Sequence, residues 1–342
     1  MPAPSPLHLA VALDGAGWHP AAWREPDARP RELFSGRYWT GLVQEAERGL
    51  LDFVTFEDSL GPGATRLDAV LVAARVAPRT RHIGLVPTAT VTHTEPFHIS
   101  KAIATLDHVS TGRAGWQVRV STDPAEAAHF GRRAAPTPAE AWQEAHDYVE
   151  VVRALWDSWE DDAEIRDAAT GRFVDRDKLH RIDFEGKWFS VRGPSITPRP
   201  PQGQPLVAAD FAGSADLVFV TPGEPVDFSA PHVFGDLVVF LDERPTDRKA
   251  RLDELHGSPY EPQAPVFTGT PAQLADLLLE WQDAGLTGFR LRPGAIPHDL
   301  TAITRLLVPE LVRRGAFRES YQADTLRGLL GLAQPANRYQ AV

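Results

Sequence analysis

The sequence carries at residues 106–120 the stretch LDHVSTGRAGWQVRV, in which the end of a helix leads into the short apolar run Ala114–Val120. Seven further apolar runs are similarly rich in Val, Leu, Ile and Phe, and longer segments of helical period separate most of them. This alternation is typical of repeated βα units around a parallel sheet. The eight strands that we predict are Leu7–Leu13, Asp52–Glu57, Ile83–Val86, Ala114–Val120, Leu206–Ala209, Leu217–Thr221, Leu237–Leu241 and Gly288–Arg292. Eight such strands predict an α/β fold of the TIM (β/α)8-barrel type.

Two of the intervening helices have capping boxes at their start, Thr137-Pro138-Ala139-Glu140 and Thr270-Pro271-Ala272-Gln273. In each, a threonine hydroxyl can cap free backbone N–H groups, and proline suits the first helical position. Apolar residues then recur at spacings of three and four, which places them on one face of a helix. A last helix, Leu300 to Arg314, ends in basic residues that suit the negative end of the helix dipole.

Composition narrows the class of protein. The chain has 342 residues and a net charge of -11, which argues against non-specific binding of nucleic acid, because such binding needs a basic face. No cysteine is present, so disulfides and thiolate metal sites are excluded. The first residues lack a signal-peptide pattern, and no apolar run approaches a membrane-spanning length. We therefore expect a cytoplasmic protein that binds small molecules or other proteins.

We expect one domain over residues 1–342, with an insertion at 157–205 after helix four and a C-terminal tail at 316–342. The helical period breaks down in 157–205, which is too long for an ordinary connection in a compact barrel. Trp188, Phe189 and Val191 suggest a small local hairpin beside the barrel mouth. The paired acids Asp161-Asp162 belong to a charged stretch, which is more often a solvated surface than a metal site, and we predict no metal.

Several motifs occur together in one order. They are Leu106 to Trp116, Leu155 to Ala163, Arg166-Asp167, Thr170 to Phe173, Ile182 to Phe189, Gly193-Pro194, Pro309-Glu310-Leu311, Arg313-Arg314-Gly315, Tyr321 and Thr325 to Leu332. On these segments the chain resembles the nitrilotriacetate and dibenzothiophene-sulfone monooxygenase group of the bacterial-luciferase-like flavoenzymes. The resemblance extends over almost the whole chain apart from residues 210–265.

This resemblance implies a TIM barrel that binds FMN. In the family the flavin is usually reduced by a separate partner reductase, and oxygen is then used to oxidise a small organic substrate. Function resides in a site rather than in a fold, so each position must be weighed by itself. The resemblance also suggests a homodimer, by analogy alone.

Polar residues stand at or after the carboxyl ends of the predicted strands, where barrel enzymes carry their chemistry. As candidates for cofactor binding we name Asp58, Thr88, Thr90, Gln117, Ser121, Trp142 and Asp210. Such groups could orient a flat, mostly apolar ring through its hydrogen-bonding edges. Taken singly, each could equally be an ordinary polar residue at a strand end, and the resemblance favours a cofactor contact for Asp58, Thr88 and Ser121.

Several positions depart from the family pattern. Gln117 replaces an asparagine, Val120 a threonine and Trp142 a tyrosine, and each change removes or reshapes a polar group. After strand five the family has a Gly/Ser loop and a helix whose N-terminus holds the phosphate. Here Asp210 leads through Phe211-Ala212-Gly213-Ser214-Ala215 straight to the next strand. We therefore predict a barrel that is degenerate around strands five to seven and lacks helix five, while the presence of helix six stays open.

Two further hypotheses concern charged and titratable groups at the mouth. Glu57 and Arg119 stand where the family leads us to expect small or apolar residues, and they could pair and fill part of the flavin site, or be two unrelated exposed charges. His93, just past strand three, is our catalytic candidate, because a histidine there could pass a proton to flavin or substrate. For His98 and His108 we favour local hydrogen bonding.

Three functions stay open. The first is an FMN-dependent monooxygenase that acts on a small organic substrate and oxygen. The second is a non-catalytic or flavin-poor relative that serves as a partner subunit. The third is an enzyme that uses the remodelled pocket without flavin.

Overall fold

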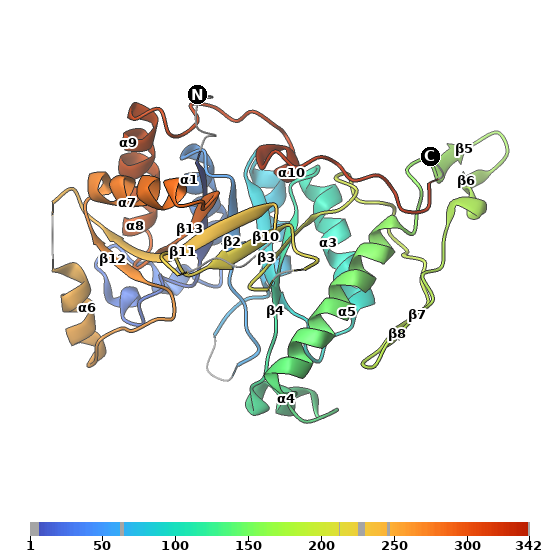
Figure 1. The fold of residues 1–342 in the computed structure, drawn as a ribbon, viewed down its shortest axis with the longest axis horizontal. Helices are drawn as coiled ribbons and strands as arrows, with labels where there is room; N and C mark the ends of the chain where they lie inside the picture. The colour runs from blue at the N-terminus through green and yellow to red at the C-terminus, as the bar shows by residue number, and fades with distance from the viewer. Residues whose placement is uncertain (1–6, 62–64, 212, 225–229, 245–246, 341–342) are drawn as a thin grey trace.

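Eight parallel strands close into a ring in a computed structural model that describes residues 7–61, 65–211, 213–224, 230–244 and 247–340. The order around the ring is β1–β2–β3–β4–β9–β10–β11–β13, and β13 pairs with β1 to complete it (Figure 1). Their bounds are β1 (His8–Leu13), β2 (Phe53–Phe56), β3 (Gly84–Thr90), β4 (Gly115–Arg119), β9 (Leu206–Ala209), β10 (Leu217–Val220), β11 (His232–Leu241) and β13 (Gly288–Pro293). The prediction of a TIM-type barrel is confirmed, and each predicted strand contributes to the ring.

Helices surround the ring, with α3 and α5 on one flank and α7, α8 and α9 on the other (Figure 1). They are α1 (Gly36–Arg48), α2 (Ala69–Val76), α3 (Pro96–Ser110), α4 (Pro124–Phe130), α5 (Pro138–Asp157), α6 (Arg248–His256), α7 (Pro271–Asp283), α8 (His298–Ala302), α9 (Val308–Arg313) and α10 (Leu326–Leu329). Both predicted capping boxes are formed, at Thr137 and Thr270. A π-helical turn at Ile303–Leu307 joins α8 to α9, so the predicted last helix is continuous. Single 3-10 turns occur at Ala22–Arg24, Pro30–Glu32, Ala77–Arg79 and Arg176–Lys178.

The connection from β9 to β10 departs from the βα pattern. Its described residues, 210–211 and 213–216, form bends and no helix, while Ala212 lies outside the described residues. Helix α5 covers the connection instead: Trp142 packs against Phe211, and Arg153 donates to the Ser214 carbonyl and to Asp216. The next connection, from β10 to β11, also has no helix in its described residues 221–224 and 230–231. The predicted degeneracy is therefore observed wherever these two connections are described.

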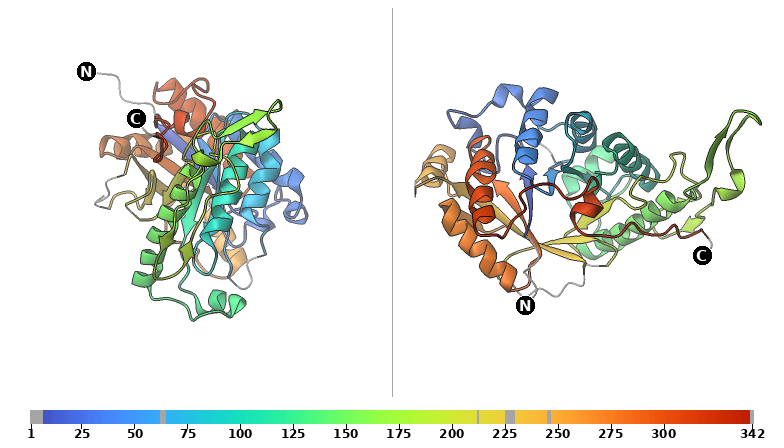
Figure 2. Two further views of the ribbon diagram at one scale, coloured as in Figure 1. Left: turned by 90° about the vertical axis from the view of Figure 1, so that its right-hand side faces the viewer. Right: turned by 90° about the horizontal axis from the view of Figure 1, so that it is seen from above.

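Two parts of the chain add elements to the βα pattern: the segment beyond β11, which was not predicted, and residues 157–205, where the small hairpin expected at Trp188, Phe189 and Val191 is formed. Helix α6 leads to β12 (Val266–Gly269), which pairs with the last residues of β11 at the outside of the ring. Residues 157–205 form two small antiparallel hairpins, β5 (Glu164–Asp167) with β6 (Arg172–Val174), and β7 (Phe184–Glu185) with β8 (Ser190–Val191). The first projects away from the barrel (Figure 2). The turn of the second lies beside the start of α5, with Trp188 against Arg133.

The amino-terminal end of the barrel is closed by the C-terminal segment. Leu326 and Leu330 are buried in one apolar cluster with residues of the barrel interior. Leu326 lies so close to the first residues of β3 and β4 that a Cβ atom at Gly84 would stand 2.5 Å from its side chain and one at Gly115 3.2 Å from it. Glycine at these two positions therefore leaves room for the plug. No helix in the described part of the chain is long and apolar enough to cross a membrane.

Candidate functional site

The opposite, carboxyl end of the barrel gathers most of the predicted site residues. Thr88 and Thr90 lie within β3, which extends further than predicted, and Gln117 lies beside Thr88 in the pairing of β3 with β4. Thr88 is 1% exposed, and its hydroxyl has no hydrogen-bond partner among the described residues. A buried hydroxyl without a partner is costly unless another group completes it. The end of β3 therefore offers an unused hydrogen-bonding group.

Gln117 is held by an arginine from across the ring. Arg290, on β13, is 1% exposed and donates from Nη1 to Gln117 Oε1 at 2.7 Å. Strand β4 lies opposite β13 in the ring of eight, so the Arg290 side chain spans the barrel interior. A guanidinium group can only donate, and the Gln117 oxygen must therefore face it. The Gln117 NH2 group makes no hydrogen bond to another described residue, so its donors are unused.

Arg290 belongs to a compact charged cluster that we did not predict from the sequence. It donates twice to Asp236 on β11, at 3.1 and 2.6 Å, and Arg292 also binds Asp236, with its Nε at 2.9 Å. The Arg290 guanidinium lies 3.5 Å from the ring centre of Phe219, and Arg292 stacks on Trp18. The sequence of Gly288–Pro293 could have indicated this cluster, because its two arginines alternate with apolar residues on a largely buried strand. Paired charge therefore fills the upper interior of the barrel.

The two acids beside this cluster titrate differently. Burial alone would raise the pKa of Asp236, but the charges of Arg290 and Arg292 outweigh it and hold the pKa below its usual value. Burial raises the pKa of Glu57, and the same two arginines offset that effect only in part. Glu57 lies 3.6 Å from Arg290 and accepts a hydrogen bond from Thr55. Asp236 is therefore the main counter-ion of the buried arginine.

The hypothesis that Glu57 pairs with Arg119 is wrong. Arg119 instead binds the carboxylate of Glu126 on α4, with contacts of 2.8 and 3.0 Å, and it also donates to the hydroxyl of Thr90. Glu126 is buried, and the Arg119 charge holds its pKa low although burial acts to raise it. Arg119 therefore holds α4 over the end of β4. The sequence alone did not show that α4 would bring the Glu126 carboxylate within reach of Arg119.

His93 occupies a strained and enclosed position after β3. Its φ angle is +70°, which is unfavourable for residues other than glycine and asparagine, and its side chain is 5% exposed. Neither ring nitrogen has a hydrogen-bond partner among the described residues, and the ring stacks on Phe130 of α4. Burial, and then the charge of Arg133, lower its pKa. The geometry gives a neutral imidazole whose proton acceptor is unused.

The other predicted residues are placed apart from this group. Asp58 accepts hydrogen bonds from the backbone of Ser59 and Ala69, so it organises the loop before α2. Ser121 is buried just after β4, where its backbone N–H donates to Thr92. Trp142 supports the short connection after β9. Asp210 is exposed at the end of β9, where it lines a hollow together with Asp236 and Arg292.

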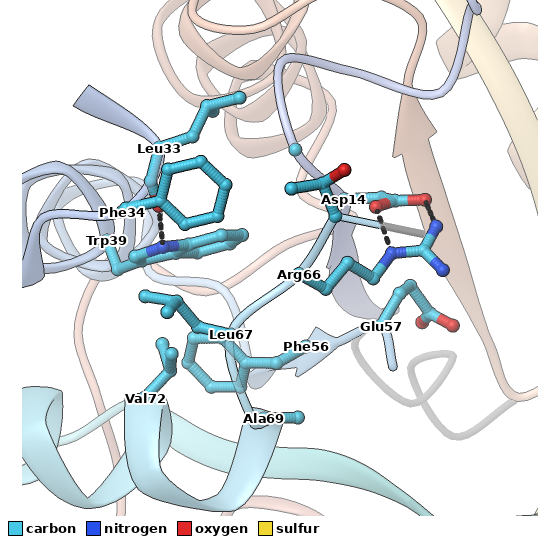
Figure 3. A pocket seen from close by; sticks show the side chains of 12 residues that line it. Asp14, Leu33, Phe34, Trp39, Phe56, Glu57, Arg66, Leu67, Ala69 and Val72 are labelled. Carbon is cyan, nitrogen blue, oxygen red and sulfur yellow. Dashed lines mark hydrogen bonds and ion pairs between the residues drawn. The ribbon is translucent and has the colours of Figure 1, made fainter. Parts of the chain in front are cut away.

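Two hollows border the mouth. One, of about 220 Å³, is lined by Asp210, Phe219, Thr221, Asp236, Gln263 and Arg292, on the side where the barrel connections are short. The other lies at the ends of β1 and β2, with an apolar wall that includes Trp39 and Phe56 and the ion pair of Asp14 with Arg66 at its far side (Figure 3). It leaves room for only about 20 Å³. The described residues contain no group of three or more His, Asp or Glu side chains placed to hold a metal ion.

Comparison with known proteins gives a consistent picture of relationship. A family model described as luciferase-like monooxygenase matches residues 16–217. Nitrilotriacetate monooxygenase component A of Aminobacter aminovorans is 30% identical over 441 aligned positions, which cover 97% of this chain and 97% of that protein. The solved structure of EDTA monooxygenase from Chelativorans sp. BNC1 superposes with a TM-score of 0.81 at 24% identity, covering 96% of this chain and 99% of that chain. That likeness concerns the fold.

The alignments also show how the length of this chain compares with the lengths of its relatives. The 441 positions aligned with the Aminobacter protein exceed the 342 residues of this chain, so this chain lacks residues that the relative has. One of the subunits of pristinamycin IIA synthase from Streptomyces pristinaespiralis is 30% identical over 304 positions, which cover 88% of this chain and 90% of that protein. Hardly any of those 304 positions can be gaps in this chain. The chain is thus similar in length to this synthase subunit and shorter than the Aminobacter relative.

Proposed function

The chain belongs to the luciferase-like monooxygenase family, and we propose that it is an FMN-dependent monooxygenase that oxidises a small organic molecule. In this proposal a separate reductase supplies the reduced flavin, as the word "component" in the name of the Aminobacter relative suggests for that protein. We place the activity in the cytoplasm, since a chain without cysteine suits a reducing compartment.

One observation carries the proposal: polar groups at the carboxyl ends of β3 and β4, of which the Thr88 hydroxyl and the His93 ring nitrogens are fully enclosed, have no hydrogen-bond partner among the described residues. The Thr88 hydroxyl, the Gln117 NH2 group and the His93 ring make no hydrogen bonds to the described chain that would occupy them. Polar edges of a flavin ring are the kind of partner that could complete such groups. The first half of the mouth therefore fits the ring of the cofactor.

The second half of the mouth offers little that would bind the phosphate group of FMN. No helix N-terminus follows β9 in the described residues, although such an end is a favourable anion site. The arginines described near the mouth are already paired with carboxylates: Arg66 with Asp14, Arg119 with Glu126, Arg133 with Glu144, and Arg290 and Arg292 with Asp236. The proposed site would therefore hold the flavin mainly by its ring.

Within this proposal the residues have distinct roles. Reduced flavin, when bound, supplies the electrons with which oxygen is activated. Gln117 and Thr88 would orient the ring, and Arg290 would fix which side of the Gln117 amide faces it. His93, neutral because its pKa is lowered, would accept or return a proton at a ring nitrogen.

An anaerobic titration tests the proposal. The purified chain is mixed with dithionite-reduced FMN, and bound flavin is measured by equilibrium dialysis. We expect saturable binding of one flavin per chain, and product formation when a flavin reductase, NADH and candidate substrates are added. Failure to bind both oxidised and reduced FMN would exclude this function.

A second candidate function is that of a partner subunit that does not itself hold flavin. The short connection after β9 and the almost ungapped match to a synthase subunit favour it. In this case the paired charges of Arg290 and Asp236 close the old cofactor site. Absence of flavin binding by this chain alone, together with flavin binding or activity when a longer member of the same family is added, would support this candidate over the first.

A further inference from the structure

The hollow of about 220 Å³ lies over the ends of β9, β10, β11 and β13. The connections after β9 and β10 contain no helix in their described residues, so the usual crossover helices do not cover this side of the mouth. Its volume is that of roughly seven water molecules in the liquid, which suits a ligand the size of a free amino acid.

Asp210 gives the hollow a carboxylate that is still available. Its side chain makes no hydrogen bond or ion pair with another described residue, and the charges of Arg290 and Arg292 act on it from beyond ion-pair distance. Asp236, the other carboxylate in the wall, is occupied, because each of its oxygens accepts from both arginines. Asp210 is therefore the acceptor left for a positively charged group.

Arg292 supplies the opposite charge in a fixed orientation. Its Nε donates to Asp236 at 2.9 Å, its Nη2 binds the same carboxylate, and its guanidinium lies 4.2 Å from the ring centre of Trp18. These contacts use one edge of the guanidinium, and Nη1 makes no hydrogen bond to another described residue. Because the side chain is already held, little conformational freedom is lost when a ligand binds. The outer edge of Arg292 is therefore a preorganised donor for a carboxylate.

Uncharged groups complete the wall. Neither the Thr221 hydroxyl nor the Gln263 side-chain amide has a hydrogen-bond partner among the described residues, and both line the hollow. Phe219, Val220 and Ala264 add apolar surface beside them. A few polar groups on an apolar wall are typical of a small-molecule site.

We propose that this hollow binds a small zwitterion of the amino acid class. Its ammonium group would contact Asp210, its carboxylate the outer edge of Arg292, and its apolar part Phe219 and Val220. A ligand with only negative charge, such as a phosphate ester, would be repelled by Asp210, and a simple amine would be repelled by Arg292. A ligand that carries both charges meets each with its opposite, which makes the site selective.

The hollow is joined to the candidate flavin site by hydrogen bonds. Asp236 binds both Arg292, in the wall of the hollow, and Arg290, which donates to Gln117. The groups that would hold the zwitterion and the group proposed to orient the flavin ring thus belong to one chain of contacts. That the zwitterion is the substrate rests on the proposed function, whereas its binding does not.

Isothermal titration calorimetry on the full chain without flavin tests the binding. The probes are L-leucine and 5-aminopentanoate, which carry their two charges close together and far apart. Each is compared with compounds that keep one charge: 4-methylpentanoate and 3-methylbutylamine for leucine, pentanoate and pentylamine for 5-aminopentanoate. We expect at least one zwitterion to bind at least about tenfold more tightly than its two matched compounds. No binding of either zwitterion, or a smaller ratio, would overturn the proposal.

Removing one charge tests the placement. Asp210→Asn should weaken binding of the zwitterion about tenfold but not that of its matched carboxylate, because only the ammonium contact is lost. The melting temperature should be unchanged, since Asp210 is exposed and unpaired among the described residues. Asp283→Asn is the matched control, as it removes the same charge from an exposed position at the end of α7. Unchanged binding in Asp210→Asn, or an equal loss in both variants, would contradict the proposed contact.

The role as substrate has its own test. With FMN, NADH and a flavin reductase present, the zwitterion that binds should be converted to an oxidised product, and Asp210→Asn should raise its KM about tenfold. A zwitterion that binds but is not oxidised by a chain that does bind reduced FMN would overturn the substrate role. Failure to bind FMN would instead overturn the proposed function and leave the measured binding in the hollow standing.

Discussion

The two halves of the barrel mouth are built from the same parallel strands, but they differ in whether a helix follows each strand and in whether their polar groups are free. From β1 to β4 a helix follows each strand, and the rim presents the unused groups of Thr88, Gln117 and His93. From β9 to β11 the described connections contain no helix, and the charges of Arg290, Arg292 and Asp236 satisfy one another inside the ring. One half keeps groups free for a ligand, whereas the other uses most of its polar groups internally.

The difference shows what the crossover helices contribute besides covering the sheet. A helix after a strand can point free backbone N–H groups at the mouth and support a loop there. Where the helix is absent, α5 supports the link through Trp142 and Arg153, and no such anion site is created by the described residues. Losing a helix thus removes a binding element while leaving the strand in place.

The largest effect should come from breaking the internal charge cluster. Arg290→Met leaves Asp236 with Arg292 alone and removes the partner of Gln117. We expect the free energy of unfolding, measured in urea, to fall by about 3 kcal/mol, because the buried Asp236 loses one of its two arginine partners and Glu57 loses the arginine beside it. Replacing Asp236 by leucine in the same chain should recover part of this loss. A change below about 1 kcal/mol would mean that the cluster contributes little to stability.

The next effect concerns the half with free groups. His93→Asn removes the imidazole but tolerates the positive φ, so the fold should be retained. If His93 moves a proton, turnover should fall by about 10²-fold with little change in flavin binding. An unchanged turnover would remove His93 from the proposed chemistry.

The same variant tests a pH dependence. Because the pKa of His93 is lowered in the folded state, the folded protein binds fewer protons than the unfolded chain just below pH 6.5. Stability from this group is therefore present above that pH and is lost as the pH falls. Denaturation from pH 7 to pH 5 should show His93→Asn losing less stability than the unchanged protein. The opposite difference would contradict a lowered pKa.

We expect a smaller effect on flavin affinity when only the NH2 group of Gln117 is replaced. Gln117→Glu keeps an acceptor for Arg290 but replaces the unused donors with a carboxylate oxygen. Affinity for reduced FMN should fall by about tenfold while the melting temperature is maintained. Gln117→Asn serves as the comparison, because it keeps both amide groups on a shorter side chain. Equal affinities for all three proteins would show that Gln117 does not face the flavin.

The smallest effect should come from removing the phosphate of the ligand. Since the second half of the mouth lacks an evident anion site in its described residues, reduced riboflavin should bind within about threefold of reduced FMN. Anaerobic dialysis with each flavin measures the ratio. Much tighter binding of FMN would show that the phosphate is held by groups that we have not identified, and the contrast between the halves would then be smaller than described.

Much of the fold could be predicted from local patterns. The eight apolar runs mark the ring strands because a parallel strand is buried on both faces, and the capping boxes fix the starts of α5 and α7. The absence of helix five followed from the shortness of the link alone. Strand β12 was missed because its short run, Val266–Gly269, is partly exposed and lies outside the ring.

The site was less predictable, because its contacts join strands far apart in sequence. Thr88, Gln117 and His93 were named from their places at strand ends, and their roles toward a ligand stay predictions. The partner of Arg119 was assigned wrongly, since Glu126 comes within reach only when α4 folds back over β4. Arg290 was overlooked because its partners, Asp236 on the neighbouring strand β11 and Gln117 across the ring, become evident only in the folded barrel.

The plug at the amino-terminal end has a consequence for how the chain is made. Leu326 closes the space left by Gly84 and Gly115, yet it is synthesised more than two hundred residues after them. A nascent chain on the ribosome can therefore pair its first strands, but the bottom of its barrel stays open to water until translation has nearly passed the tail. Contacts between residues so far apart in sequence form slowly, so we expect the bottom of the barrel to be the last part of its core to close.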